Sequence, residues 1–218
     1  MSGARLLISS RNYSSWSLRG FLLCRLSGLP FTVITASHEE PAVKAELLQR
    51  SPTIRLPTLL MGDITVWDTL AIAEHLNETH PKARMLPEEP AARAHCRSIS
   101  GEMHSGFAAL RSSLPLNVRA RRAGFNLWSG PRADIALIQQ IWEGCLERWG
   151  GPWLFGARPS IADAMYAPVA SRFLTYDVKL APPAAGYRDH ILAWPDMAEW
   201  MAEAEREPEA IEELEVEF

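Results

Sequence analysis

The stretch that decides the fold is Ser51–His75, SPTIRLPTLLMGDITVWDTLAIAEH. It contains two short apolar runs, Thr58–Met61 and Ile64–Trp67, separated by the turn-forming pair Gly62-Asp63. Two apolar runs joined by such a turn are typical of a β-hairpin. The sequence therefore predicts a hairpin here, entered from a loop that contains prolines.

A helix is expected directly after this hairpin. Asp68-Thr69 supplies capping side chains, and Leu70, Ala73 and Leu76 recur on one face of the helix that would follow. The free N–H groups of its first turn point back toward the loop that contains Pro57. A helix N-terminus beside an X-Pro turn can hold a carboxylate, so this stretch is a candidate ligand site.

The residues before this stretch add two strands and two helices. Strands are expected at Leu6–Ser9 and Phe31–Thr35, and helices at Trp16–Leu26 and at about 39–49. The resulting order is β-α-β-α-β-β-α. Two parallel strands followed by a hairpin are the layout of a thioredoxin-like domain.

The character of the chain changes near residues 81–90, where prolines are frequent and a linker is expected. We therefore divide the chain into a domain at 1–80, the linker, and a domain at 91–218. Strand signals vanish in the last part, which predicts an all-α domain. Its expected helices are Ala91–Leu114, Pro131–Trp149, Ser160–Leu174 and Pro195–Glu205.

Composition excludes several classes of protein. The chain has 218 residues and a formal net charge of −4, but its last twelve residues contain six Glu and no Lys or Arg. The rest of the chain is therefore near neutral, which gives no reason to expect a nucleic-acid partner. No apolar run is long enough to span a membrane. Neither a membrane location nor secretion is expected.

The cysteines and histidines predict neither a disulfide framework nor a metal site. Cys24, Cys96 and Cys145 are far apart and odd in number, as in a protein of the reducing cytoplasm. The six histidines are scattered and form no metal-binding set.

The order of loop, proline, hairpin, acid-hydroxyl pair and helix resembles the glutathione-binding half of glutathione transferases. A second match is Leu154-Phe155-Gly156 followed by Ser160 and Asp163, which is similar to the buried helix cap in the second half of that family. The resemblance covers the whole chain and implies glutathione as co-substrate. It makes Ser160 and Asp163 structural residues.

The resemblance also implies which residues bind glutathione. The Leu56 backbone, preceding a cis Pro57, would hold the cysteinyl part of the tripeptide. Asp68 and Thr69 would hold its γ-glutamyl end; the family more often has Glu or Gln followed by Ser. Arg55 stands where relatives place a residue that meets the glycyl carboxylate, although a solvated arginine explains it equally well.

Thiol activation is expected from the loop Asn12-Tyr13-Ser14-Ser15, at the N-terminus of the first helix. Orphan N–H groups and the helix dipole favour an anion such as a thiolate there. The run Asn12–Arg19 resembles the serine-containing loops of the zeta, tau and theta classes. We take Ser14 as the first candidate and Ser15 as the second, with Tyr13 and Asn12 as alternatives; a helix cap is the other role open to Ser14.

Two functions remain open. The first is an enzyme that adds glutathione to a small electrophile or uses it for an isomerisation, and the second is a binding or scaffolding protein without turnover. No cysteine occupies the first helix terminus, which disfavours disulfide exchange. A homodimer is expected from the resemblance. The residues of the second half expected to line the co-substrate pocket are Cys96, Ser100, Met103, His104, Phe107 and Arg111. Four arginines near its expected mouth could favour an acidic acceptor: Arg111, Arg119, Arg121 and Arg122.

Overall fold

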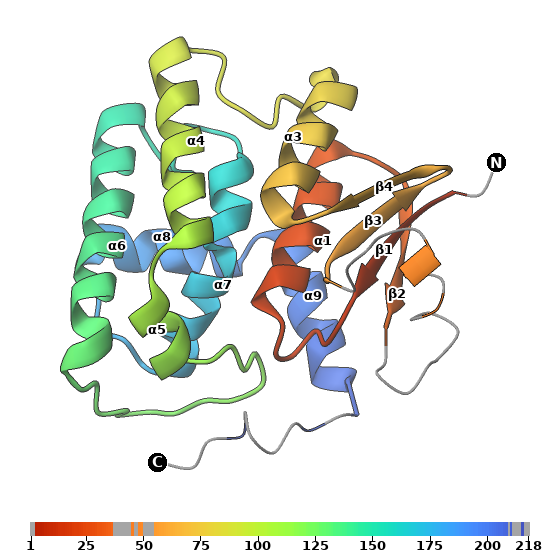
Figure 1. Cartoon of the computed structure of the whole chain (residues 1–218). Helices are drawn as coiled ribbons and strands as arrows, with labels where there is room; N and C mark the ends of the chain where they lie inside the picture. Colours follow the sequence, from red (N-terminus) through yellow and green to blue (C-terminus); the bar gives the residue numbers. More distant parts are fainter. Residues whose placement is uncertain are drawn as a thin grey trace.

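The computed structural model describes residues 3–36, 45, 48–49, 55–208, 210 and 215. Most of the helix expected at about 39–49 lies outside the described residues. The described chain begins with a small mixed sheet and continues as a set of helices (Figure 1).

The sheet has four strands in the order β2-β1-β3-β4. β1 pairs with β2 in parallel and with β3 in antiparallel, and β3 pairs with β4 as the expected hairpin. The bounds of the strands are β1 Ala4–Ile8, β2 Phe31–Thr35, β3 Thr58–Met61 and β4 Ile64–Trp67. The layout of two parallel strands and a hairpin is therefore confirmed, with β1 beginning two residues earlier than predicted.

Two helices pack between this sheet and the helical half, as Figure 1 shows for α1 (Ser15–Ser27) and α3 (Thr69–Thr79). α1 ends at Gly28, whose φ of 72° is a left-handed conformation that glycine adopts without strain. α3 begins at the Asp68 cap, as the sequence predicts.

The second half is helical. The described helices there are η1 Pro81–Ala83, α4 Pro90–Ser105, α5 Ala108–Ser113, α6 Ser129–Trp149, α7 Ile161–Thr175, α8 Pro182–Leu192 and α9 Pro195–Arg206. Two expectations need correction: the predicted helix at Ala91–Leu114 is two helices, and α8 was not predicted.

The break between α4 and α5 has a local cause. Gly106 is extended, with φ −98° and ψ −166°, and Phe107 is left-handed with a φ of 58°. Arg111 then turns back and donates to the backbone carbonyl oxygens of Met103 and His104, the latter at 2.9 Å. The end of α4 is thus capped by a side chain from α5, an interaction that apolar periodicity does not reveal.

The start of α7 is the buried cap that the sequence predicts. The Asp163 carboxylate accepts from the Ser160 backbone N–H and hydroxyl, both at 2.7 Å, and from the Leu154 N–H at 3.1 Å. The Tyr187 hydroxyl from α8 donates to the same carboxylate at 2.9 Å. Ser160 and Asp163 therefore join three segments of the helical half.

One apolar core runs through both halves of the molecule. It contains Leu6 of β1, Leu18 of α1 and Met165 of α7, each fully buried. Arg19 of α1 crosses the same boundary and donates from Nε to the Met165 carbonyl oxygen at 2.7 Å.

The linker residues are also anchored to the helical half. Met85 is fully buried, and its carbonyl oxygen accepts from the Ile161 N–H at 2.9 Å. Among the described residues, no helix is long and apolar enough to cross a membrane.

Candidate active site

A cavity of about 350 Å³ lies where the first half meets the end of α4. Its volume falls within the range of small-molecule sites. It is lined by Trp16, Arg55, Leu56, Pro57, Asp68, Thr69 and His104. All five residues that the sequence predicted to bind glutathione therefore lie around one cavity.

The Leu56-Pro57 turn forms one wall of the cavity. Its peptide bond is cis, as expected from the resemblance. The Thr58 hydroxyl donates to the Arg55 carbonyl oxygen at 2.6 Å, which closes the turn at the start of β3. On the other side, α1 approaches the proline ring closely, because its residue at position 20 is a glycine.

Asp68 is held in place by both its backbone and its carboxylate. Its φ of 74° is unusual for a residue other than glycine, and its Oδ1 accepts from the Leu70 N–H at 2.8 Å. Its Oδ2 lies 2.7 Å from His104 Nε2, which belongs to α4 in the other half. The carboxylate thus caps α3 and pairs with an imidazole across the cavity.

Thr69 presents a buried hydroxyl to the cavity. The residue is 1% exposed, and its Oγ1 has no hydrogen-bond partner in the described part of the chain. Because buried hydroxyls in native proteins nearly always have a partner, this one fits a polar group of a bound ligand.

Trp16 lies behind the cavity and contacts charged groups. Its ring is 5.1 Å from the His104 ring in an edge arrangement, and the guanidinium carbons of Arg19 and Arg111 are 4.7 and 4.8 Å from its centre. Arg19 is fully buried, and its burial, with Arg172 and Arg111 nearby, holds its pKa well below the usual value. Two guanidinium groups therefore lie against the Trp16 ring.

The four candidates for thiol activation do not line this cavity. Ser14 caps α1, because its Oγ accepts from the Ser17 N–H at 3.2 Å, which leaves its own O–H available as a donor. Ser15 is buried in the first turn of α1. Asn12 and Tyr13 reach the loop that follows α5, where Asn12 Oδ1 accepts from the Arg119 N–H at 3.0 Å and the Tyr13 hydroxyl accepts from Arg119 at 3.2 Å.

Some of the residues expected to line a co-substrate pocket lie at or beside this cavity, and others are buried in the core. His104 lines the cavity and Arg111 lies beside Trp16, whereas Cys96 and Met103 are buried in the core. The contact of His104 with Asp68 was not foreseen, because the two residues are 36 positions apart.

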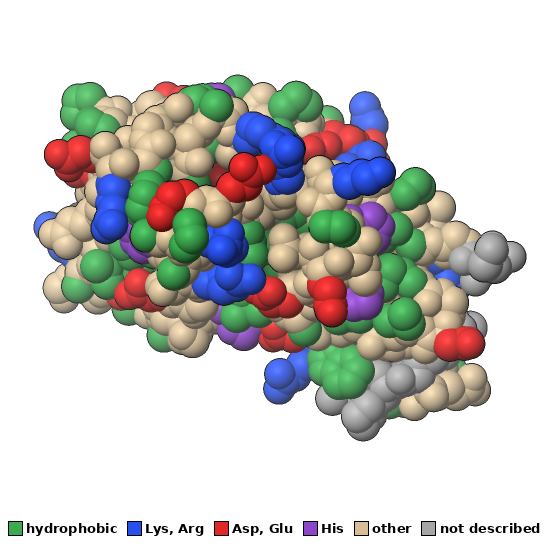
Figure 2. All heavy atoms as spheres, turned by 90° about the horizontal axis from the view of Figure 1, so that it is seen from above, with side chains coloured by type: hydrophobic (Ala, Val, Ile, Leu, Met, Phe, Trp, Pro, Cys, Tyr) green, Lys and Arg blue, Asp and Glu red, His purple; other side chains and the backbone are tan. Residues whose placement is uncertain are grey.

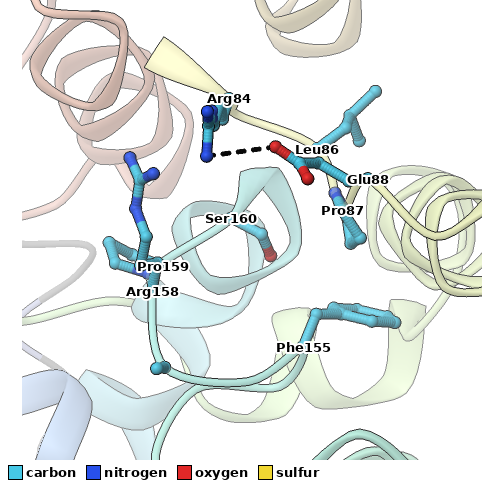
Figure 3. Close-up of a pocket in the computed structure, with 9 residues that line it drawn as sticks. Arg84, Leu86, Pro87, Glu88, Phe155, Arg158, Pro159 and Ser160 are labelled. Atoms are coloured by element: carbon cyan, nitrogen blue, oxygen red, sulfur yellow. Dashed lines mark ion pairs between the residues drawn. The ribbon is translucent and has the colours of Figure 1, made fainter. Parts of the chain in front are cut away.

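A second hollow, of about 220 Å³, lies between the linker and the turn before α7. Figure 3 shows the side chains of Arg84 and Glu88, both from the linker, directed toward each other, and they form an ion pair at 3.1 Å. Arg84 and Glu88 pair with each other and Arg158 donates to the Ala83 carbonyl oxygen at 3.3 Å, so this hollow is a weaker candidate than the cavity at Asp68.

On the face seen in Figure 2, basic and acidic side chains of the described residues are interspersed. Within the described ranges, no group of three His, Cys, Asp or Glu side chains is placed to hold a metal ion.

Comparison with known proteins agrees with this geometry. The family model for the N-terminal domain of glutathione S-transferases matches residues 13–79, and that for the C-terminal domain matches residues 107–203. The chain belongs to the glutathione S-transferase family. The N-terminal match includes Tyr13 and Ser14 of the loop before α1, Ser15 at the start of α1, and the residues from Arg55 to Thr69 that line the cavity.

The curated relatives of this glutathione S-transferase family member include several that are named maleylacetoacetate isomerase or probable maleylacetoacetate isomerase. A probable maleylacetoacetate isomerase of Caenorhabditis elegans is 28% identical over 175 residues, which cover 79% of each chain. The maleylacetoacetate isomerase of Rattus norvegicus is 27% identical over 175 residues, again with 79% of each chain.

Solved structures of glutathione transferases share the fold. A Burkholderia homologue with bound glutathione has a TM-score of 0.70 at 20% identity, covering 94% of this chain and 100% of its own. A maleylacetoacetate isomerase of Anaeromyxobacter dehalogenans with bound glutathione has a TM-score of 0.65 at 22% identity, covering 96% and 98%.

Proposed function

We propose that this chain is an enzyme that binds glutathione in the cavity at Asp68 and uses its thiol on a small electrophile. The observation that carries this proposal is the convergence of the ligand residues expected from the sequence on one cavity that also contains the unpartnered Thr69 hydroxyl. In this assignment residues 1–80 bind glutathione, 81–90 are the linker, and 91–218 hold the second substrate.

The chemistry of the cavity matches that of the tripeptide. Glutathione carries an ammonium and a carboxylate at its γ-glutamyl end and a carboxylate at its glycyl end. Asp68 would accept from the ammonium, while the Thr69 hydroxyl and the N-terminus of α3 would donate to the neighbouring carboxylate. Arg55 would meet the glycyl carboxylate, and the Leu56 backbone would pair with the cysteinyl residue.

Ser14 is the residue we propose as donor to the thiolate. As the cap of α1 it accepts a hydrogen bond, so its proton is free to serve a second acceptor at the positive end of the helix. A charge-assisted bond of about 1.5–3 kcal/mol would lower the thiol pKa by about 1–2 units. Ser15, Tyr13 and Asn12 remain the alternatives, and the contacts of Tyr13 and Asn12 with Arg119 make them weaker ones.

The reaction we favour is a glutathione-dependent isomerisation, since several curated relatives are named maleylacetoacetate isomerase. Addition of the thiolate to an electrophile, as in detoxification, would use the same glutathione-binding cavity and the same donor to the thiolate. The positive charge of Arg19 and Arg111 behind Trp16 favours an anionic second substrate. We place the protein in the cytoplasm, where glutathione is abundant.

We also propose that the chain forms a homodimer. A homodimer is what membership of the glutathione S-transferase family leads us to expect. Light scattering should report about twice the chain mass of 24.3 kDa.

The decisive experiment measures binding and thiol ionisation separately. Calorimetry should show glutathione affinity falling tenfold or more, about 1.4 kcal/mol, in the Asp68→Ala/Thr69→Ala variant. Thiolate absorbance titrated against pH should show a bound pKa that rises by about 1–2 units in Ser14→Ala with little loss of affinity. Ser98→Ala, an exposed serine of α4, is the control.

Two outcomes would redirect this assignment. A bound thiol pKa in the wild type equal to that in solution, with tight binding and no turnover, would favour a non-catalytic binding protein. An unaltered pKa in Ser14→Ala with a raised one in Tyr13→Phe would transfer the donor role to the tyrosine.

A further inference from the structure

Three polar side chains converge on one carboxylate outside the cavity described above. The Tyr13 hydroxyl donates to Glu215 Oε1, and Asn117 Nδ2 donates to Glu215 Oε2 at 3.1 Å. The Arg119 guanidinium is 3.9 Å from Glu215 Oε1 and donates to the Tyr13 hydroxyl at 3.2 Å. Both oxygens of the carboxylate are therefore engaged, by a phenol, an amide and a guanidinium.

These donors are held by the fold independently of the glutamate. Asn117 is 1% exposed and Tyr13 is 8% exposed. The Asn117 Oδ1 accepts from the Ala120 N–H at 3.2 Å, and its carbonyl oxygen accepts from the Thr175 hydroxyl at 2.9 Å. The side-chain amide is thus fixed with its N–H groups directed toward the glutamate.

The two segments that supply the donors are joined directly. The Val118 N–H donates to the Asn12 carbonyl oxygen at 3.2 Å, and the Arg119 N–H donates to Asn12 Oδ1 at 3.0 Å. The loop before α1 and the loop after α5 are therefore held together through Asn12. A carboxylate site built on two joined loops is organised before its ligand arrives.

The occupant comes from the chain itself. Glu215 lies beyond the end of α9, and its side chain is 39% exposed. Glu207, at the end of the same helix, is bound more firmly: its carboxylate accepts from the Ser10 hydroxyl at 2.6 Å and from the Arg11 and Asn12 N–H groups at 2.8 and 2.9 Å. Glu207 thus anchors the end of α9 by contacts that do not involve Glu215.

We propose that Tyr13, Asn117 and Arg119 form a binding site for a small carboxylic acid, and that Glu215 is its internal competitor. Because two of the three donors are buried, only a carboxylate on a slender molecule reaches them. The site goes beyond glutathione binding, since none of its residues lines the cavity at Asp68. A ligand that enters it releases the Tyr13 hydroxyl from Glu215.

The test uses succinate as probe and the side-chain amide of Asn117 as reporter. In the full-length protein labelled with ¹⁵N, this amide signal should shift with succinate, and Glu215→Ala should bind the probe at least fivefold more tightly than the wild type. Adding Tyr13→Phe or Arg119→Gln to Glu215→Ala should weaken binding at least tenfold. Glu205→Ala, an exposed glutamate of α9, should behave as the wild type.

Tyr13→Phe keeps the aromatic ring, so the proposal stays testable if Arg119→Gln fails to fold. Equal succinate affinity in Glu215→Ala and wild type, or shifts confined to other amides, would overturn the proposal. Glutathione titrations of the same variants keep this result separate from the assignment of the main cavity. If the wild type does not bind glutathione, the assignment of the cavity at Asp68 is rejected and the carboxylate site is unaffected.

Discussion

Gly20 of α1 lies so close to Pro57 that a Cβ atom at position 20 would stand 2.7 Å from the Pro57 Cγ atom. Such a contact is shorter than van der Waals packing allows, so the absence of a side chain lets the cis-proline turn rest on the helix. The wall of the cavity that we assign to the cysteinyl part of glutathione is therefore positioned by a glycine on a neighbouring element.

Replacing this glycine should displace the turn. We expect Gly20→Ala to weaken glutathione binding about tenfold, because Pro57 and the Leu56 backbone must move away from α1, and we expect calorimetry to show it. Gly144→Ala is the matched control: position 144 of α6 has open space around it, and alanine is the better helix former by about 1 kcal/mol. Unchanged affinity in Gly20→Ala would show that the turn can shift without consequence.

His104 should act on glutathione through Asp68. Its Nε2 is 2.7 Å from Asp68 Oδ2, so the imidazole holds the carboxylate in one orientation. We expect His104→Leu to remove this contact and weaken glutathione binding about fivefold to tenfold, with kcat changed less than KM. His104→Gln keeps a donor and should recover part of the affinity. His75→Gln on α3 serves as control. Tighter binding in His104→Leu would instead mean that the imidazole competes with the ligand for the carboxylate.

The buried cap of α7 should be essential for stability. In Asp163→Ala the Leu154 N–H, the Ser160 N–H and the Tyr187 hydroxyl lose their acceptor inside the protein. We expect the free energy of unfolding, measured by urea denaturation, to fall by about 3 kcal/mol or more. Asp63→Asn, at the exposed turn of the hairpin, should change it by less than about 0.5 kcal/mol.

The cysteines should be inert in the native protein. Burial raises the pKa of Cys24 and Cys145 to about 12 and that of Cys96 to about 11. Since the thiolate is the reactive form, at pH 8 only about one thiol in a thousand or fewer is ionised. An aromatic disulfide reagent should label none of the three in the native state and all three in urea. Rapid labelling of the native protein would contradict the burial of these side chains.

Local patterns predicted the first half of the molecule because its determinants are close in sequence. The turn at Gly62-Asp63 and the apolar runs on either side of it predict the hairpin, and the Asp68 side chain caps the helix that begins at the next residue. The residues around the cavity from Arg55 to Thr69 lie within fifteen positions of one another in the sequence, so one motif identified them together.

The features missed by sequence reasoning depend on contacts between distant segments. The break at Gly106 is stabilised by Arg111 from the next helix, and the His104 pair with Asp68 forms only when α4 packs beside α3. The contact of Glu215 is the extreme case, because the composition of the acidic end of the chain gives no indication that this residue meets Tyr13, which lies 202 positions away.

The continuous core has a consequence for engineering new substrates. Exchanging the entire helical half with that of a relative is an attractive way to change the acceptor while keeping glutathione. In this chain the exchange would separate Arg19 from the Met165 carbonyl oxygen and break the packing of Phe21 against Trp200, whose ring centres are 5.1 Å apart. Chimeras should therefore be made by grafting the residues that face the second substrate, with α7 and α9 retained from the parent.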